Sequence, residues 1–469
     1  MTLLGRMTDA IWNPWLLGLF LIVGLVYSLG SGFFQFFGAK RWLSATFGSL
    51  FRRQERSGNG LSSLQALATA LASTMGTGSI AGVATALTLG GPGAIFWMWI
   101  SALLGMMTGC GEKLLAVRYQ CRAPGGGFQG GPMFYLRDGI GAPRLARWFA
   151  LAGLPATLAG GNLVQSSSIA ASLESAFHMD RLAVGLVTAL LAGLVMVGGI
   201  GRIANVSSAL VPAMAALYLG CGGAVLCANA SALPEAFRLI FSCALSPSAA
   251  LGGGAGWTVT SALRYGVARG VFTNEAGLGT SAMAHGAARV DHPAQQGMWG
   301  IFEVFLSTLV VCTVTALVIL VSGVWQPAVP GALTGAPLTA AAFSSVLGPA
   351  GAGVVALSLL MFAFSSILGW SYYGQQCLRF LVGDDRLLPL YRGVFLCCTL
   401  AGALGEPGMI WQLVDLFNAL MALPNLTALL WLAPEAVIIL NQWARESVPR
   451  SRRPIHAPKK SGKEIEKNA

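Results

Sequence analysis

Eleven long apolar segments, separated by short polar or basic stretches, run through most of this 469-residue chain. A helix of about 20 apolar residues crosses the hydrocarbon core of a bilayer, where the backbone has to satisfy its own hydrogen bonds. Only 10% of the residues are charged, whereas soluble domains carry about 25%. The sequence therefore predicts an all-α polytopic membrane protein. The predicted spans are about 14–37, 61–89, 94–117, 149–177, 182–200, 206–228, 257–287, 298–324, 351–382, 388–404 and 409–440.

The second of these spans is interrupted by small residues at its centre. Residues 73–82 read STMGTGSIAG, at a depth where no water satisfies a broken backbone. Such a stretch indicates either close helix packing, which small residues allow, or a helix broken in mid-membrane whose free amides and carbonyls line a ligand site. Taken alone, the stretch favours packing.

The seventh span contains a second interruption, TNEAGLG at 273–279. When the first span is set aside, ten spans remain as five plus five, and the odd number makes the second half run opposite to the first. Interrupted helices at corresponding positions of two inverted halves point to the midplane site of a secondary transporter. The correspondence therefore favours broken helices over packing at both positions.

This organisation divides the chain into five parts. Residues 1–60 are predicted to form an extra N-terminal transmembrane helix and a basic cytoplasmic loop, and residues 441–469 a basic cytoplasmic tail. The first inverted repeat is expected at 61–228 and the second at 257–440, with an extracytoplasmic linker at 229–256 between them.

The positive charges are distributed unevenly between alternate loops. With the loop at 40–56 placed in the cytoplasm, about 24 of the 29 Lys and Arg residues lie on that side, and only Arg6, Arg181 and Arg238 lie outside. Because cytoplasmic loops are enriched in Lys and Arg, we expect the N-terminus outside and the C-terminus in the cytoplasm of a bacterial plasma (inner) membrane. Topology thus accounts for the net charge of +11, and no nucleic-acid partner is expected.

Polar groups in and beside the two breaks are candidates for binding a zwitterion and a cation. Free amides at the N-terminus of a half-helix attract a carboxylate, whereas carbonyl and hydroxyl oxygens suit a hard cation such as sodium. The candidates of this kind are Thr74, Thr77, Ser79, Thr273 and Asn274. Ser365 and Ser366 lie in a later span, where they either bind an ion or donate hydrogen bonds to carbonyls of their own helix.

Two acidic residues, Glu275 and Glu303, lie within predicted spans. Such groups are costly at membrane depth and usually have a function, so each is a candidate for a proton or charge role. For Glu275, a structural salt bridge with Arg264 or Arg269 of the same span is an equally good interpretation.

Four other polar or aromatic positions have competing interpretations. Glu112, beside Lys113 near the end of a span, is expected to form an interfacial ion pair. Gln165 presents a polar face that bonds either to another helix or to a substrate. Trp370 lies one helical turn from Ser366, well inside its span, although interfacial anchoring is the usual role of such a residue. His285 is expected to be structural.

Six short motifs together resemble the alanine/glycine:cation symporters. They run in order along most of the chain: GTGSIAGVA at 76–84, GPGAIFWMW at 91–99, GPM at 131–133, NEAGLG at 274–279, TLVVCT at 308–313 and GWSYYG at 369–374. The resemblance implies a LeuT-type 5+5 inverted-repeat fold within the amino acid–polyamine–organocation superfamily, preceded here by one extra helix. It also implies sodium-driven uptake of alanine, glycine or a similar small neutral amino acid.

The resemblance implies a position for the substrate and for sodium. The substrate-binding residues carried over by position are Thr77, Gly78, Gln165, Thr273, Asn274, Gly277, Ser366 and Trp370. The implied sodium ligands are backbone oxygens near Ala72 and Met75 and the hydroxyls of Ser365 and Ser366. Thr74, Ser79 and Ser307 are weaker candidates for a second cation site.

This chain departs from the family pattern at two positions. Ser79 stands where the family usually has Asn, and Ser307 where it usually has an acidic residue. Both positions are expected near a second cation or the substrate amine, so the changes remove strong ligands. Glu303, one helical turn from Ser307, could restore the lost charge. We expect one coupling sodium ion instead of two, or an altered substrate preference.

The sequence as a whole therefore predicts a transporter, with Na⁺ as coupling ion and no cofactor. Its expected partners are a small neutral amino acid, sodium and the lipid bilayer. One alternative is a proton-coupled amino-acid transporter that uses Glu275 or Glu303, and another is a non-transporting amino-acid receptor of the same fold. An intramembrane enzyme built on Glu275 or His285 is not expected, because the sequence shows no paired nucleophile and base.

Overall fold

The computed structural model describes residues 11–50, 61–123, 126–245, 258–326, 332–405 and 407–446. These residues are almost entirely helical, and the two short strands among them, β1 (Cys121–Arg122) and β2 (Phe128–Gln129), pair antiparallel. Five of the described helical segments are long and apolar enough to cross a membrane: 93–118, 199–228, 293–321, 349–382 and 410–446. The prediction of an all-α polytopic membrane protein is confirmed.

The first predicted span is shorter in the structure than in the sequence analysis. Its helix α2 (Pro14–Gly30) ends where Gly32 and Phe33 adopt left-handed φ angles of 65° and 55°. The chain then continues in α3 (Phe34–Phe37) and α4 (Ala39–Leu50). The apolar run to residue 37 therefore overestimated the helix, because hydropathy does not register a tight turn between apolar residues.

Both predicted helix breaks are confirmed. The first broken helix consists of α5 (Ser63–Thr74), the single turn η1 (Thr77–Ser79) and α6 (Ala81–Gly90). The second consists of α15 (Val259–Asn274) and α16 (Ala282–His285), joined by seven residues that form no helix. Capping boxes at Ser62 and Thr258 start α5 and α15, since a hydroxyl there satisfies an otherwise free amide.

The two broken helices run antiparallel through the centre of the molecule. The first half of one packs against the second half of the other, because α5 contacts α16 and α6 contacts α15. At one end, the Arg289 amide donates a 3.1 Å hydrogen bond to the Leu61 carbonyl. This arrangement agrees with oppositely directed halves, whose boundaries stay a prediction.

The remaining helices surround this pair. Those before the second broken helix are α7 (Gly93–Arg118), α8 (Pro132–Phe134), η2 (Tyr135–Gly139), α9 (Pro143–Leu158), η3 (Ala159–Leu163), α10 (Val164–Phe177), α11 (Arg181–Val197), α12 (Gly199–Ala228), η4 (Ala230–Ala232) and α13 (Leu233–Leu245). Those after it are α17 (Pro293–Val304), η5 (Phe305–Cys312), α18 (Thr313–Val321), α19 (Gly335–Leu347), α20 (Pro349–Val382), α21 (Leu388–Leu404) and α22 (Pro407–Glu446).

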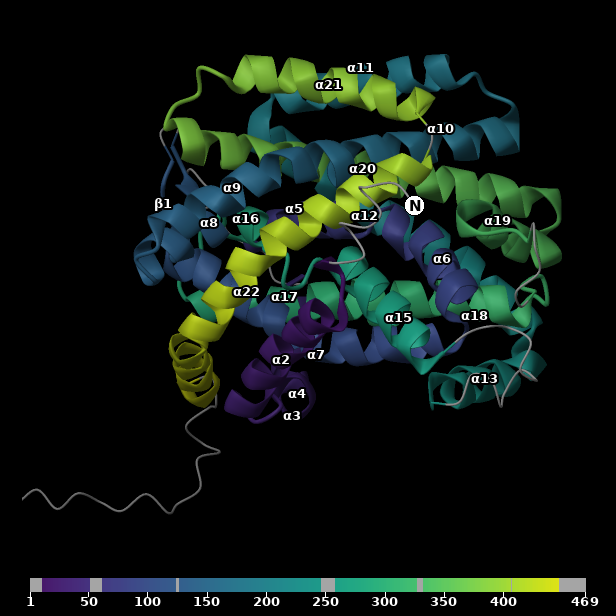
Figure 1. The fold of residues 1–469 in the computed structure, drawn as a ribbon, viewed down its shortest axis with the longest axis horizontal. Coiled ribbons are helices and arrows are strands. Elements are labelled where there is room, and N and C mark those ends of the chain that lie inside the picture. Colours follow the sequence, from purple (N-terminus) through teal and green to yellow (C-terminus); the bar gives the residue numbers. More distant parts are fainter. Residues whose placement is uncertain are drawn as a thin grey trace, which may run out of the picture.

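The scaffold positions the breaks from several sides. In Figure 1, α11 and α21 lie side by side along one edge of the molecule, and α22 crosses its face diagonally. Helix α7 packs against α15 and α17, and α20 packs against α5. The linker predicted at 229–256 contains α13, which packs against α7. Its residues 246–256, residues 51–60 of the basic loop, and the tail beyond residue 446 lie outside the described residues.

Candidate functional site

A small cavity lies where the two helix breaks face each other. Its volume is about 10 Å³, which is space for about one water molecule. Three of the predicted substrate-binding residues, Gly78, Gln165 and Trp370, line it. The other lining residues are Ser73, Thr74, Gly76, Gly160, Phe272 and Glu275.

Gln165 connects the first break to a distortion in the neighbouring helix. Its Oε1 accepts a 3.2 Å hydrogen bond from the Thr77 amide, and its Nε2 donates a 3.1 Å bond to the Gly160 carbonyl. Gly160 belongs to η3, a π-helical turn, and such turns leave backbone groups free for other partners. The Thr77 hydroxyl is buried without a hydrogen-bond partner in the structure. In the unwound segment, Gln165 therefore binds the Thr77 amide, and the Thr77 hydroxyl is buried without a partner.

The predicted sodium ligands meet at the end of α5. Ser365 Oγ lies 2.9 Å and Ser366 Oγ 3.1 Å from the Ala72 carbonyl oxygen, and Ser366 Oγ also lies 3.0 Å from the Ser73 carbonyl. The last carbonyls of a helix have no partner within it, so these hydroxyls satisfy them. Met75 caps the same helix, and its side chain is fully buried. The structure therefore brings hydroxyl and carbonyl oxygens from α20 and α5 together in a buried place.

Two of the candidates for a second cation site, Ser79 and Ser307, lie around Cys312. The thiol donates a 3.2 Å hydrogen bond to the Ser307 carbonyl, and it also lies beside Ser79 and Thr273. The Ser79 hydroxyl is buried without a hydrogen-bond partner, whereas Ser307 Oγ lies 3.5 Å from the Val304 carbonyl in its own helix. Thr74 donates to carbonyls of α5. Ser79, Thr273 and Ser307 therefore lie around the Cys312 thiol, whereas Thr74 lines the small cavity together with Glu275.

Glu275 does not form the salt bridge that was one interpretation of the sequence. Its φ angle of 55° is left-handed, which is uncommon for a residue other than glycine, and its carboxylate accepts a hydrogen bond from the Thr280 hydroxyl. Arg269 instead lies 3.8 Å from Asp415 and over the ring of Trp411. Glu275 therefore faces the small cavity without an arginine partner.

Asn274 and Gly277 do not line the small cavity. Asn274 Nδ2 donates a 3.2 Å hydrogen bond to the Thr308 hydroxyl, and its Oδ1 accepts one from the Ala276 amide. The Gly277 amide donates a 2.9 Å hydrogen bond to Glu112 Oε1. A Cβ on Gly277 would lie 2.6 Å from the Phe20 ring, which places this residue against α2. Both residues fix the shape of the second break.

The expectation that Glu112 and Lys113 form an interfacial pair was wrong. Both side chains are fully buried. Glu112 Oε1 accepts hydrogen bonds from Gly277 and from Asn425 Nδ2, and the latter also donates to the Gly277 carbonyl. The Tyr135 hydroxyl bonds to Asn425 Oδ1. The pair lies inside the molecule because helices α8 and α22 cover this end of α7.

A second layer of polar contacts lies at the end of α7. Tyr119 donates a 2.5 Å hydrogen bond to Glu435 Oε2, and Arg118 Nε lies 3.0 Å from Glu435 Oε1. Burial and the bond to Glu435 raise the pKa of Tyr119 to about 12. Tyr119 therefore keeps its proton at neutral pH and remains a hydrogen-bond donor to α22.

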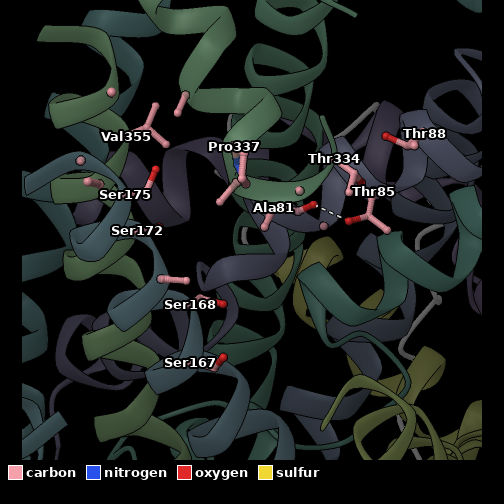
Figure 2. Close-up of a pocket in the computed structure, with 18 of the residues that line it drawn as sticks. Ala81, Thr85, Thr88, Ser167, Ser168, Ser172, Ser175, Thr334, Pro337 and Val355 are labelled. Atoms are coloured by element: carbon pink, nitrogen blue, oxygen red, sulfur yellow. Dashed lines mark hydrogen bonds between the residues drawn. The ribbon is translucent and has the colours of Figure 1, made fainter. Parts of the chain in front are cut away.

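A much larger cavity of about 600 Å³ lies on the α6 side of the breaks. Figure 2 shows hydroxyls of α10, including Ser168 and Ser172, on one wall, and Thr85 and Thr334 on the other. Its remaining wall residues are mostly Ala, Gly and aliphatic side chains of α6, α19 and α20. This space is large enough for an amino acid with its hydration water.

An aromatic layer separates the two cavities. Phe272 lines the small cavity, and Arg269 and Trp411 line the large one. The rings of Phe272 and Trp411 pack at 5.1 Å, and the Arg269 guanidinium lies 4.8 Å from the Trp411 ring centre. The route from the large cavity to the breaks is therefore closed by two rings and one ion pair.

Sequence reasoning missed several of these residues. Gly160 and Phe272 lie in apolar segments, where a glycine or an aromatic residue is far more often part of the packing. Asp415 was an available signal, because an acid in the last predicted span at membrane depth is unusual.

Trp370 and Gly161 are in close contact, since a Cβ on Gly161 would lie 2.2 Å from the Trp370 Cβ.

Comparison with known proteins identifies the family. The model of the sodium:alanine symporter family matches residues 1–456. The chain belongs to this family. It is 41% identical over 438 residues to the sodium/alanine symporter AgcS of Methanococcus maripaludis, covering 92% of this chain and 94% of that one. The family is one of transporters, so this sodium:alanine symporter family member is a multi-pass membrane transporter and not an enzyme.

Other similar proteins extend the comparison. This family member is 35% identical over 448 residues to a Bacillus subtilis protein named "Probable sodium/glutamine symporter GlnT", covering 95% of this chain and 91% of that one. A manganese transporter of Eremococcus coleocola has a similar structure, with a TM-score of 0.53 at 18% identity, over 81% of this chain and 85% of that one. The likeness to the manganese transporter concerns the fold alone.

Proposed function

We propose that this protein couples the entry of sodium to the uptake of a small neutral amino acid, alanine or glycine, by alternating access. The observation that carries the proposal is the meeting of the Ser365 and Ser366 hydroxyls with the Ala72 carbonyl at the broken end of α5. Oxygen atoms of this kind suit a hard cation, and an unwound helix end supplies them at membrane depth.

Sodium would be held by the backbone oxygens of Ala72 and Met75 and by the hydroxyls of Ser365 and Ser366. In the structure both hydroxyls donate to α5 carbonyls. With a cation between them, each hydroxyl would rotate and present a lone pair instead. Because the ligands come from α5 and α20, the bound ion would fix the broken helix against the scaffold.

The substrate would bind between the first break, Gln165, Phe272 and Trp370. Its carboxylate would accept hydrogen bonds from amides around Thr77 and Gly78, since free amides at a helix end attract anions. A cavity of about 10 Å³ has to expand to admit even glycine, and the nearby rings leave little space for a large side chain. This supports alanine or glycine over larger amino acids.

The hydroxyls of Thr74, Ser79 and Ser307 support a single coupling ion. A second sodium beside the substrate amine would need strong oxygen ligands, and around Cys312 the residues Ser79 and Ser307 offer only hydroxyl and carbonyl oxygens. Glu303 does not restore the charge at Ser307, because its Oε2 lies 3.4 Å from Lys113 Nζ and 3.4 Å from His285 Nε2. We therefore expect one sodium per amino acid.

We also propose that the protein lies in a bacterial plasma membrane with its N-terminus outside and its C-terminus in the cytoplasm. The excess of Lys and Arg in alternate loops supports this orientation. It places the large cavity, which lies beside α6 and α19, on the outer side. The five-part division of the chain, with repeats at 61–228 and 257–440, belongs to the same proposal.

Proton coupling is the second candidate, because one observation favours it. Glu275 lies at the small cavity with its side chain fully buried and no arginine partner. A carboxylate in this place could carry a proton between the two sides of the membrane.

Uptake of radiolabelled alanine into proteoliposomes tests the proposal. We expect concentrative uptake with an inward sodium gradient and none with an inward proton gradient alone. Uptake driven by protons alone would move coupling to Glu275. Binding of alanine without uptake in any gradient would favour a receptor. The variant Glu275→Gln distinguishes the two coupling ions, because sodium-driven uptake does not need a titratable group at position 275 and should survive the change.

A further inference from the structure

A second buried polar region lies beside the second break and takes no part in the proposed transport site. It consists of Glu112 and Lys113 of α7, His285 of α16, and Gln296 and Glu303 of α17, each fully buried or nearly so. None of these residues lines either cavity. A group of ionisable side chains away from water is costly, so its charges have to be in balance.

Glu303 lies between two nitrogen atoms. Its Oε2 is 3.4 Å from Lys113 Nζ and 3.4 Å from His285 Nε2. Lys113 Nζ is also 3.3 Å from Glu112 Oε2. Neither Glu303 oxygen nor His285 Nε2 has a well-formed hydrogen bond in the structure. Charge pairing is therefore what holds Glu303 in place.

The other nitrogen of His285 determines which ring position carries a proton. His285 Nδ1 lies 2.5 Å from Gln296 Oε1, and an amide oxygen can only accept a hydrogen bond. With this orientation of the Gln296 amide, Nδ1 carries a hydrogen. If Nε2 lacked one, its lone pair would face the Glu303 carboxylate, which is repulsive.

The charge balance of the buried groups also favours a hydrogen on both ring nitrogens of His285. If Glu112 and Glu303 are both ionised, they carry two negative charges, and Lys113 supplies one positive charge. A neutral His285 would leave one negative charge uncompensated away from water, whereas an imidazolium ion brings the four groups to zero. Buried charges are stable only when they are paired.

The other titratable groups around this region bring no positive charge. Glu275 of the second break is a further acid, and α20 contributes Tyr373, whose hydroxyl is buried without a partner in the structure. Helix α5, which packs against α16, has no titratable side chain within Ser63–Thr74. None of these groups supplies the missing positive charge.

We propose that His285 is a proton-binding site, occupied in this conformation, at which an imidazolium ion pairs with Glu303. The ion pair between His285 and Glu303 links α16 to α17, and the contact of Glu303 with Lys113 links both to α7. Movement of α16 away from α17 would expose the pair to water and allow the proton to leave. The inference goes beyond the transport proposal and does not depend on which ion or amino acid is moved.

Nitrogen-15 NMR of histidine-labelled protein in lipid bilayers tests this directly, because the chain has only four histidines. Replacing the other three by Gln (H178Q, H292Q and H456Q) leaves His285 as the single source of signal. At pH 7.5, where exposed histidines are neutral, we expect both ring nitrogens of His285 to be protonated. An unprotonated ring nitrogen in this sample would overturn the proposal.

Variants of the partner residue extend the test. Glu303→Gln should remove one ring proton from His285, whereas Glu303→Asp should keep both, and two protonated nitrogens in Glu303→Gln would contradict the pairing. Glu435→Gln is the matched control, since Glu435 pairs with the partly exposed Arg118 at the end of α7, and it should leave the His285 signal unchanged. If Glu303→Gln does not fold, the spectra of the parent protein and of Glu303→Asp still test whether both ring nitrogens of His285 are protonated.

Discussion

Single hydroxyl groups distinguish the proposed sodium site from ordinary helix packing. Ser365 Oγ lies 2.9 Å from the Ala72 carbonyl, but also 2.8 Å from the Phe362 carbonyl of its own helix, and its one proton can serve only one of them. Ser366 Oγ lies 3.1 Å from the Ala72 carbonyl and 3.0 Å from the Ser73 carbonyl, so its one proton goes to α5 in either case. Ser366 is therefore the more informative position, since its hydroxyl points out of its own helix toward the break.

Replacement of Ser366 by Ala should weaken sodium binding. Loss of one oxygen ligand is expected to raise the sodium concentration for half-maximal alanine uptake about tenfold, which corresponds to about 1.4 kcal/mol. Ser371→Ala is the matched control, because Ser371 is equally buried in α20 but donates a 2.7 Å hydrogen bond to Leu368 of its own helix. Equal sodium dependence of uptake in the two variants would show that Ser366 does not bind sodium.

The residues themselves show what a sequence can and cannot indicate. The hydroxyls of Ser365 and Ser366 and the breaks at Gly76 and Gly277 were found from polar or small residues in apolar segments. Phe272 was not, because an aromatic residue in such a segment matches the lipid-facing or core pattern. Burial of Glu112 depends on α22, more than 300 residues away, and local sequence carries no record of that contact.

At the scale of helices, the second break is held in shape by contacts with the scaffold. The Gly277 amide and carbonyl bond to Glu112 and Asn425 respectively. Because an unwound segment at membrane depth has no water to satisfy it, these side chains replace the missing helical hydrogen bonds. Helices α7 and α22 therefore determine where the free groups of the break can point.

Glu112→Ala should destabilise the protein by about 3–5 kcal/mol, because it removes one of the two carboxylates beside buried Lys113 and leaves the Gly277 amide without its partner. Denaturant or thermal unfolding in detergent measures the loss. Glu235→Ala provides the comparison, since Glu235 and Arg238 form an exposed pair on α13, and exposed pairs contribute little to stability. Similar stabilities of the two variants would show that the Glu112 contacts do not hold the break.

The positions of the helices were largely predictable, and their detailed form was not. Each predicted span corresponds to a helix or a broken helix because apolar length is sufficient to specify a membrane segment. The turn at Gly32 and the π-helical turns η2, η3 and η5 were not predicted. A turn between apolar residues leaves hydropathy unchanged, and a π-helical turn is determined by packing rather than by composition.

On the scale of the whole molecule, the two cavities indicate a conformation with one accessible side. The large cavity reaches the layer formed by Phe272, Trp411 and Arg269, and the opposite side is closed by the contacts of Glu112 and by Glu435 with Tyr119. Alternating access requires the first barrier to open while the second is closed, and then the reverse.

The large cavity should lose accessibility when sodium and alanine bind together. Ser172→Cys, in the wall of this cavity, should react with a membrane-impermeant maleimide from one face only, and saturating sodium plus alanine should slow the reaction. Labelling is counted above that of the parent chain, whose Cys227 and Cys397 are exposed. Ser322→Cys, which lies outside the cavity, should react at a rate independent of both ligands. Equal rates for Ser172→Cys with and without ligands would contradict closure.

The most direct measurement of the central claim is the reversal of transport in proteoliposomes. Alanine flux is recorded while the sodium gradient and the membrane potential are varied against a fixed alanine gradient, and the condition of zero net flux gives the number of ions per alanine. We predict one sodium ion per alanine, with no change in the reversal condition when a pH gradient is added. A reversal condition that is independent of sodium, or that requires two sodium ions, would contradict the account.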